Sequence, residues 1–339
     1  MPHIHTVHYA SVSNSHGRPR SSLPLDIHVP TASASQRFHG RKETPVVLWF
    51  HGGGCVQGTR TGMAQHMRDA VDKLGVVVVA PDYRLCPQVK LLSGVLPDCL
   101  AASQWISSHL STFLSQSASY LPPPSPRPLL CGSSVGGFLA LLLSLPLSLP
   151  DLPSPIVQAR AVAGIYPITD MGAPFFMEEQ TPFMGRLTPE EEWSQKLESY
   201  LEETSEVMSS TEGGPSNDRN KLYMWAQQNA LFPSLLFSSP TPTPSSDDVL
   251  GTRLPSRITS FSPAEASAIP PIYVVHGTKD AAVHVDQATE LVEALKQRER
   301  EVVYEERAGL DHLFDLFDEE ERMEDMWRWV AGQFGIAYE

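Results

Sequence analysis

Short apolar runs alternate with amphipathic segments along most of the chain. Amphipathic segments, with apolar side chains at helical spacing, occupy residues 61–74, 94–114, 135–145, 284–298 and 316–334. Continuous apolar runs of strand length lie at residues 46–50, 76–80, 128–131, 161–166 and 271–276, and a further β-rich run lies at 301–305. Central parallel strands have this composition because helices cover both of their faces. The alternation predicts an α/β fold with a mostly parallel sheet flanked by helices.

The N-terminal region and one long interruption depart from this rhythm. Residues 23–29 alternate apolar and polar side chains after their start, as a half-buried strand does. Residues 171–262 separate two predicted strands, and this segment is far longer than an ordinary connection in a compact domain. We therefore expect one domain over residues 1–339, with residues 171–262 inserted as a lid or cap.

The insertion is rich in aromatic side chains, which suggests a role in substrate binding. A solvated loop has little use for so much apolar ring surface, whereas a lid that excludes water from a reaction does. The alternative is that these rings only pack the insertion onto the sheet. The residues predicted to bind substrate are Phe176, Phe183, Trp225 and Phe232.

Composition narrows the classes of partner. Apolar residues make up 41% of the chain and charged residues 19%, so a large core is expected. The formal net charge of −14 argues against a nucleic-acid surface and, more weakly, against an anionic membrane surface. The longest apolar stretch is too short to span a bilayer, and no targeting segment is visible. Four scattered cysteines without a CxxC pair favour free thiols and a cytoplasmic location.

A nucleophilic serine is predicted where one apolar strand passes into a helix. The sequence Gly132-Ser133-Ser134-Val135-Gly136 matches G-x-S-x-G between the run at 128–131 and a helix start. This strand–turn–helix context is the one that a nucleophile elbow requires. The bare motif also fits a Gly/Ser turn, and the flanking elements favour Ser134 as a nucleophile.

A glycine-rich segment after an earlier strand predicts an oxyanion hole. His51-Gly52-Gly53-Gly54 follows the run at 46–50, and consecutive glycines let backbone N–H groups turn toward a developing negative charge. The N–H of Val135 is the expected second donor. We expect His51 to shape this loop rather than act as the catalytic base.

An acid and a base follow the serine in the chain order that this arrangement needs. Asp280 lies just after the strand at 271–276, and His312 lies after the strand at 301–305 and a turn. His312 would take the Ser134 proton, and Asp280 would hold the imidazole in the required tautomer. Asp286 and Asp311 are alternative acids, but Asp286 falls within a predicted helix and Asp311 adjoins His312 in sequence.

These motifs resemble the hormone-sensitive-lipase-like branch of the α/β-hydrolases over roughly residues 45–335. The resemblance includes the block Asp82-Tyr83-Arg84-Leu85-Cys86-Pro87, which matches the family's D-Y-R-L-A-P-E except at Cys86 and Gln88. It implies an α/β-hydrolase fold with the N–H groups of Gly53, Gly54 and Val135 as oxyanion donors. Many family members have an N-terminal helical cap, which is not obvious in this sequence. A softer resemblance links residues 82–87 and 166–170 to hydrolases and thioesterase-like domains of fungal polyketide pathways.

The expected function is hydrolysis of a small-molecule carboxylic ester or thioester through an acyl-serine, with no metal or organic cofactor. An acyltransferase or cyclase would use the same three residues, with another nucleophile in place of water. A non-catalytic receptor is the third reading, since plant gibberellin receptors resemble this family but lack the catalytic histidine. The presence of His312 argues against the receptor.

Overall fold

The computed structural model describes most of the chain and one large sheet within it. The described residues are 2–12, 21–36, 40–147, 149, 156–182, 185, 187–189, 196, 209–211, 218–238, 242–243, 245–318 and 320–338. The strands of this part are β1 (His3–Val12), β2 (Ser21–Val29), β3 (Val46–Phe50), β4 (Val77–Pro81), β5 (Leu129–Ser133), β6 (Val162–Ile165), β7 (Ile272–Gly277) and β8 (Val302–Arg307).

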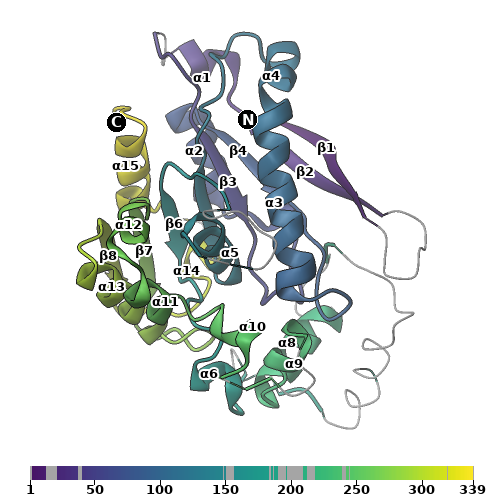
Figure 1. The fold of residues 1–339 in the computed structure, drawn as a ribbon. Helices are drawn as coiled ribbons and strands as arrows, with labels where there is room; N and C mark the ends of the chain where they lie inside the picture. The colour runs from purple at the N-terminus through teal and green to yellow at the C-terminus, as the bar shows by residue number, and fades with distance from the viewer. Residues whose placement is uncertain are drawn as a thin grey trace.

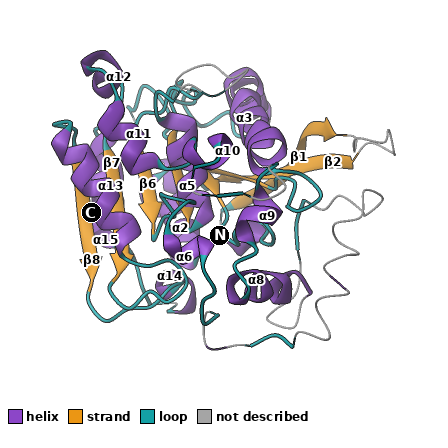
Figure 2. Cartoon of the chain, turned by 60° about the horizontal axis from the view of Figure 1, so that its bottom comes forward, coloured by secondary structure: helices purple, strands orange, loops and turns teal. Residues whose placement is uncertain are grey.

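The described strands form one eight-stranded sheet in the order β1-β2-β4-β3-β5-β6-β7-β8. Strands β1 and β2 pair antiparallel at one edge of the sheet (Figure 2). Strand β2 also pairs antiparallel with β4. Every pairing from β4 through β8 is parallel. The carboxyl ends of β5, β7 and β8 therefore lie at the same edge of the sheet, where ligands bind in open α/β folds.

Helices and helical turns connect the strands. They are α1 (Ala32–Gln36), η1 (Arg60–Gly62), α2 (Gln65–Leu74), η2 (Leu91–Val95), α3 (Leu96–Trp105), η3 (Ile106–Leu110), α4 (Ser111–Ser117), α5 (Val135–Ser144), α6 (Pro174–Met177), α8 (Asp218–Gln228), α9 (Phe232–Leu236), α10 (Asp247–Leu250), α11 (Leu254–Ser260), α12 (Pro263–Ser267), α13 (Asp286–Gln297), α14 (Phe314–Phe317) and α15 (Glu324–Gln333).

Each face of the sheet buries its own hydrophobic core. On one face, β3, β5 and β7 pack with α3, α5 and α13, and α5 is buried along its whole length. On the other face, α2 and α15 cover a second core that includes Trp49 and Tyr273. The two cores explain why the central strands read as unbroken apolar runs, because neither of their faces meets water.

The predicted strands and most of the predicted helices are confirmed, but the single helix expected over residues 316–334 is wrong. That region forms α14, which ends at Phe317, and α15, which begins at Glu324. The Asp318 side chain accepts the N–H of Glu320, and Met323 adopts a left-handed φ of 50° before α15 begins. Local side-chain-to-backbone bonding of this kind competes with helix continuation.

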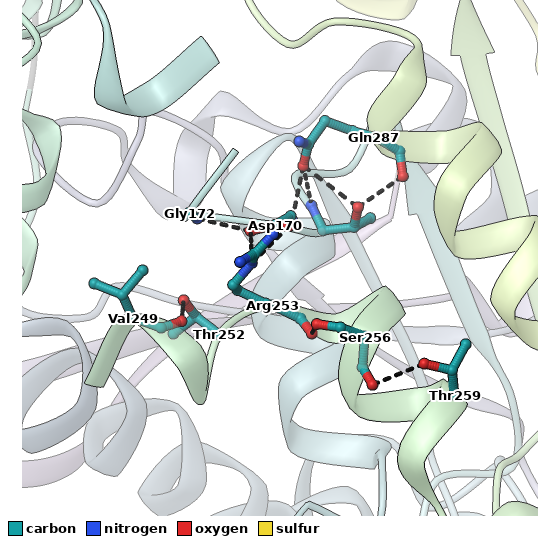
Figure 3. Close-up of polar contacts among 9 residues, drawn as sticks. Asp170, Gly172, Val249, Thr252, Arg253, Ser256, Thr259 and Gln287 are labelled. Atoms are coloured by element: carbon teal, nitrogen blue, oxygen red, sulfur yellow. Dashed lines mark hydrogen bonds and ion pairs between the residues drawn. The ribbon is translucent and has the colours of Figure 1, made fainter. Parts of the chain in front are cut away.

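The expected insertion, residues 171–262, comes back beside its own starting point at Arg253 (Figure 3). The Arg253 Nε lies 3.0 Å from the Asp170 carboxylate, and the Leu254 N–H donates to the Thr169 carbonyl. The Gln287 side chain, from α13, accepts the N–H groups of Thr169 and Asp170. Beyond Arg253, α11 packs against α13. The helices between these two ends, α6, α8, α9 and α10, gather beyond one end of the sheet (Figure 1).

Candidate active site

Ser134 occupies a strained turn between β5 and α5. Its φ of 57° with ψ of −122° is uncommon for a residue with a side chain. Ser134 lies directly after the carboxyl end of β5. Glycine at 136 permits the turn, because an added Cβ there would lie 2.1 Å from the Phe50 carbonyl oxygen. The backbone of Ser134 is held by β6, since its N–H donates to the Ile165 carbonyl over 2.9 Å. This is the local geometry predicted from the G-x-S-x-G motif.

The glycine-rich loop after β3 lies beside this turn. A Cβ added to Gly52 would be 3.4 Å from the Ser134 Cβ, so the two segments are in contact. Gly53 and Gly54 have φ values of 106° and 61°, which turns successive peptide groups away from an extended path. Val135 is the first residue of α5, where backbone N–H groups have no partner within the helix.

His51 is packed into the base of the same loop. Its Nδ1 donates to the Gly52 carbonyl over 2.8 Å, and its ring stacks on Tyr83 with centroids 4.1 Å apart. Burial lowers the pKa of the His51 imidazole to about 4, which leaves it neutral at physiological pH. These contacts support the loop-shaping role expected for this residue.

Asp280 and His312 form a direct pair at the ends of β7 and β8. The His312 Nδ1 lies 2.6 Å from Asp280 Oδ2, and both residues are buried. The other carboxylate oxygen accepts the N–H groups of Ala282 and Val283. Because the carboxylate accepts a hydrogen bond from the Nδ1–H group, the Nε2 of His312 keeps its lone pair.

Neither alternative acid contacts the His312 ring within the described residues. The side chain of Asp286 is 67% exposed and pairs with His284. The Asp311 carboxylate accepts the backbone N–H groups of Ala281 and His312 instead. The sequence argument that set these residues aside matches the geometry found.

A second histidine, His276, also faces the Asp280 carboxylate. Its Nε2 donates to the Val283 carbonyl over 2.9 Å and lies 3.2 Å from Asp280 Oδ2. Burial alone would raise the pKa of Asp280, but the charge of His312 and hydrogen bonds from both histidines outweigh it. The pKa of Asp280 therefore lies below its usual range, and the carboxylate stays ionised.

Sequence reasoning missed a buried polar network behind His312. The Tyr166 ring packs against His312 with centroids 4.4 Å apart, and its hydroxyl donates to Asp315. His66 Nε2 lies 3.1 Å from the same carboxylate, and Trp327 donates to His66 Nδ1. Since the indole N–H can only donate, His66 is the neutral Nε2–H tautomer. Tyr166 belongs to residues 166–170, which carry the softer resemblance, and no local motif signals Asp315 or His66.

A cavity of about 230 Å³ adjoins the glycine-rich loop. For scale, an engineered cavity of about 150 Å³ holds a benzene ring. Among the described residues that line this cavity, one is a carboxylate, Asp315, and none is a lysine or arginine, so the cavity disfavours an anionic group. Its lining includes Gly52, Gly53, Ser133, Tyr166, Leu313 and Asp315.

The aromatic residues predicted to bind substrate are placed unequally. Phe176, Trp225 and Phe232 are each at most 5% exposed, belong to the main hydrophobic core and are not among the cavity's lining residues. Phe232 alone of these reaches the glycine-rich loop, since its ring lies near Gly54. Phe183 lies outside the described residues. Burial in the core favours packing, the alternative considered for these rings, for Phe176 and Trp225.

Other reactive groups lie apart from this site. The four cysteines are buried free thiols, and burial raises the pKa of Cys86 to about 12. Within the described ranges, no three His, Cys, Asp or Glu side chains gather in a way that could hold a metal ion. No described helix combines the length and hydrophobicity that crossing a bilayer requires.

The sequence relatives of this chain are much larger proteins, and the chain matches only a part of each. It is 26% identical to the non-reducing polyketide synthase ausA of Aspergillus calidoustus over 293 residues, which cover 80% of this chain and 12% of that protein. It is 29% identical to the 5-methylorsellinic acid synthase of Aspergillus terreus over 184 residues, which cover 54% of this chain and 6% of that protein. The chain thus spans only a small part of these relatives, and the resemblance to fungal polyketide proteins is confirmed.

Solved structures of esterases share the fold. Carboxyl esterase 2 of Tuber melanosporum superposes with a TM-score of 0.59 at 19% identity, covering 99% of this chain and 88% of the esterase. An esterase of Pyrobaculum calidifontis has the same TM-score at 18% identity, covering 99% of this chain and 86% of the esterase. At these identities the likeness establishes the fold alone.

Family models match both halves of the chain. A prolyl oligopeptidase family model matches residues 250–337, the region that holds Asp280 and His312. A model described as alpha/beta hydrolase fold matches residues 47–217, half of the chain, including the glycine-rich loop and Ser134. The chain therefore belongs to the alpha/beta hydrolase fold family.

Proposed function

We propose that the chain is a serine hydrolase that cleaves a carboxylic ester or thioester through an acyl-Ser134 intermediate. The observation that carries this proposal is the 2.6 Å pair between His312 and Asp280, at the sheet edge where the strained Ser134 turn also lies. A nucleophile, a base and an orienting acid in this chain order define the reaction class.

The reaction begins with attack of Ser134 Oγ on the acyl carbon while His312 Nε2 takes the hydroxyl proton. The tetrahedral oxyanion is stabilised by the N–H groups of Gly53, Gly54 and Val135. Collapse releases the alcohol or thiol, which receives the proton from His312. Water then attacks the acyl-serine by the same route, which releases the acid and restores Ser134.

The cavity and the relatives support an uncharged polyketide acyl group as the substrate. A space of about 230 Å³, whose described lining holds Asp315 and no lysine or arginine, suits a ring-sized neutral group better than a carboxylate or a phosphate. The sequence relatives are polyketide synthases, which supports an acyl substrate from secondary metabolism. Acyl transfer or cyclisation is the second candidate, because the names of these relatives describe synthesis.

A substrate panel tests the function. Purified protein is expected to hydrolyse esters or thioesters from a panel of short-chain, long-chain and aryl acyl groups, with products resolved by mass spectrometry. Alcohol and thiol acceptors are added in parallel. Free acid as the main product supports hydrolysis, transfer to the acceptor supports the second candidate, and saturable ligand binding without turnover contradicts both in favour of a receptor.

The insertion is proposed to act as a lid, with Phe232 as the predicted substrate-binding residue that contacts the glycine-rich loop. Its ring lies near Gly54, so Phe232→Ala is expected to change kcat/KM for aryl esters relative to acetyl esters about 10-fold. Phe176→Ala is the matched control, because Phe176 packs edge-on against Phe232 within the core. That variant is expected to lower stability by about 3–5 kcal/mol with the substrate ratio unchanged. An equal substrate ratio in the wild type and in both variants would contradict the lid.

A further inference from the structure

The insertion contacts both the glycine-rich loop, at Gly54, and the turn that follows it, at Gly58. A Cβ added to Gly54 would lie 2.8 Å from a Tyr223 ring carbon and 3.0 Å from a Phe232 ring carbon, so both rings press against this glycine. At the turn, Thr211 donates its N–H to the Gly58 carbonyl over 2.8 Å. Thr211 Oγ1 in turn accepts the Gly58 N–H over 2.9 Å. The insertion thus forms the outer wall of the loop.

Arg219 connects the insertion to this loop from the first turn of α8. It is 2% exposed, although it carries a full positive charge. Its Nη1 donates to the Cys86 carbonyl over 2.5 Å and to the Val56 carbonyl over 3.3 Å. Its Nη2 donates to Gln88 Oε1 over 2.6 Å. The guanidinium therefore joins the insertion to two segments of the hydrolase body.

The segments that Arg219 joins include the turn that presents the oxyanion donors. The N–H groups of Val56 and Gln57 both donate to the Gly53 carbonyl, over 3.0 and 3.1 Å. The Cys55 carbonyl accepts the Cys86 N–H over 2.8 Å. A rotation of the Val56 peptide group would consequently move the peptide groups of Gly53 and Gly54.

Burial of the Arg219 charge makes this contact costly to break. A guanidinium removed from water is tolerated only where its N–H groups find acceptors of good geometry. Arg219 donates through Nη1 and Nη2 to acceptors from three separate residues, and a single lysine ammonium group is a poor substitute for these two donor nitrogens. Displacing α8 would leave the buried carbonyl groups of Val56 and Cys86 without this donor.

We propose that Arg219 is a positioning residue for the oxyanion hole, so that the insertion sets the orientation of the Gly53 and Gly54 N–H groups as well as covering the site. This inference rests on the proposed serine hydrolase function. It assigns the insertion a part in transition-state stabilisation, which a lid that only binds substrate does not have.

The expected result of Arg219→Met is a fall in kcat of about 10- to 100-fold with KM nearly unchanged, because misaligned donors weaken transition-state binding only. Arg219→Lys is expected to fall between this variant and the wild type. The inhibition constant of a trifluoromethyl ketone, which forms a tetrahedral adduct at the serine, should rise by the same factor as kcat/KM falls. A wild-type kcat in a folded Arg219→Met variant, or a change in KM alone, would overturn the inference.

Arg253→Met is the matched control. Arg253 holds the base of the insertion to Asp170 and contacts no residue of the glycine-rich loop among the described residues (Figure 3). This variant is expected to lower the melting temperature while kcat stays within about twofold of the wild type. If it lowers kcat as much as Arg219→Met does, general loosening of the insertion explains both variants and the specific role of Arg219 is lost.

If Arg219→Met fails to fold, the same kinetic measurements are made on Gln88→Met. It removes the acceptor of Arg219 Nη2 and leaves Arg219 in place, and it is expected to lower kcat several-fold, again without a change in KM. An unchanged kcat in this variant contradicts the inference. Wild-type protein without Ser134-dependent turnover would instead overturn the proposed function, so the two failures are distinguishable.

Discussion

Ser134→Ala is expected to lower turnover on the order of 10⁶-fold, the largest effect of any single substitution in this chain. The reason is that the acyl-enzyme route is lost, while the remaining donors and binding groups act only on slow attack by water. The measurement is kcat on the best substrate of the panel, under conditions that detect about 10⁻⁷ of wild-type turnover.

Ser133→Ala is the matched control for this substitution. Ser133 is the last residue of β5 and adjoins Ser134, so both variants remove one hydroxyl group from neighbouring positions of the chain. We expect Ser133→Ala to keep turnover within about 10-fold of the wild type. A reversed order of effects would transfer the nucleophile to Ser133.

Asp280→Asn is expected to lower kcat on the order of 10⁴-fold with the fold retained. An asparagine side chain that donates its amide N–H to His312 Nδ1 favours the tautomer in which Nε2 carries the proton. The Nε2 atom then no longer offers its lone pair to Ser134. The buried charge that favours the imidazolium is lost as well. The fold is expected to persist because asparagine can still accept the N–H groups of Ala282 and Val283 through its oxygen.

Asp286→Asn and Asp311→Asn are the companion variants for the acid. Asp286 is exposed on α13, and Asp311 accepts only backbone N–H groups, so neither substitution should change kcat more than a few-fold. Near-wild-type turnover in Asp280→Asn together with a collapse in either companion would move the acid to that residue.

The features predicted well from sequence are those that a short segment determines by itself. The Ser134 turn needs a strand, a glycine-flanked serine and a helix start, and all three lie within residues 128–145. The pairing of Asp280 with His312 follows almost as directly, since each comes just after a strand and parallel strands end at one edge.

The features missed depend on partners that are distant in the sequence. Arg219 meets Val56 and Cys86 only because α8 folds back across the glycine-rich loop, and nothing around residue 219 signals this contact. Asp315 likewise joins His66 from the opposite end of the chain. The break between α14 and α15 was missed because Asp318 bonding to a local N–H outweighs the helical spacing of the apolar residues.

The central claim, covalent catalysis at Ser134, is tested most directly by a fluorophosphonate probe followed by mass spectrometry of the intact protein and its peptides. The predicted result is one adduct per chain on the peptide that contains Ser134, absent in Ser134→Ala and greatly slowed in a His312→Ala variant. An adduct on another residue of the wild-type protein, or undiminished labelling of Ser134→Ala, would contradict the claim.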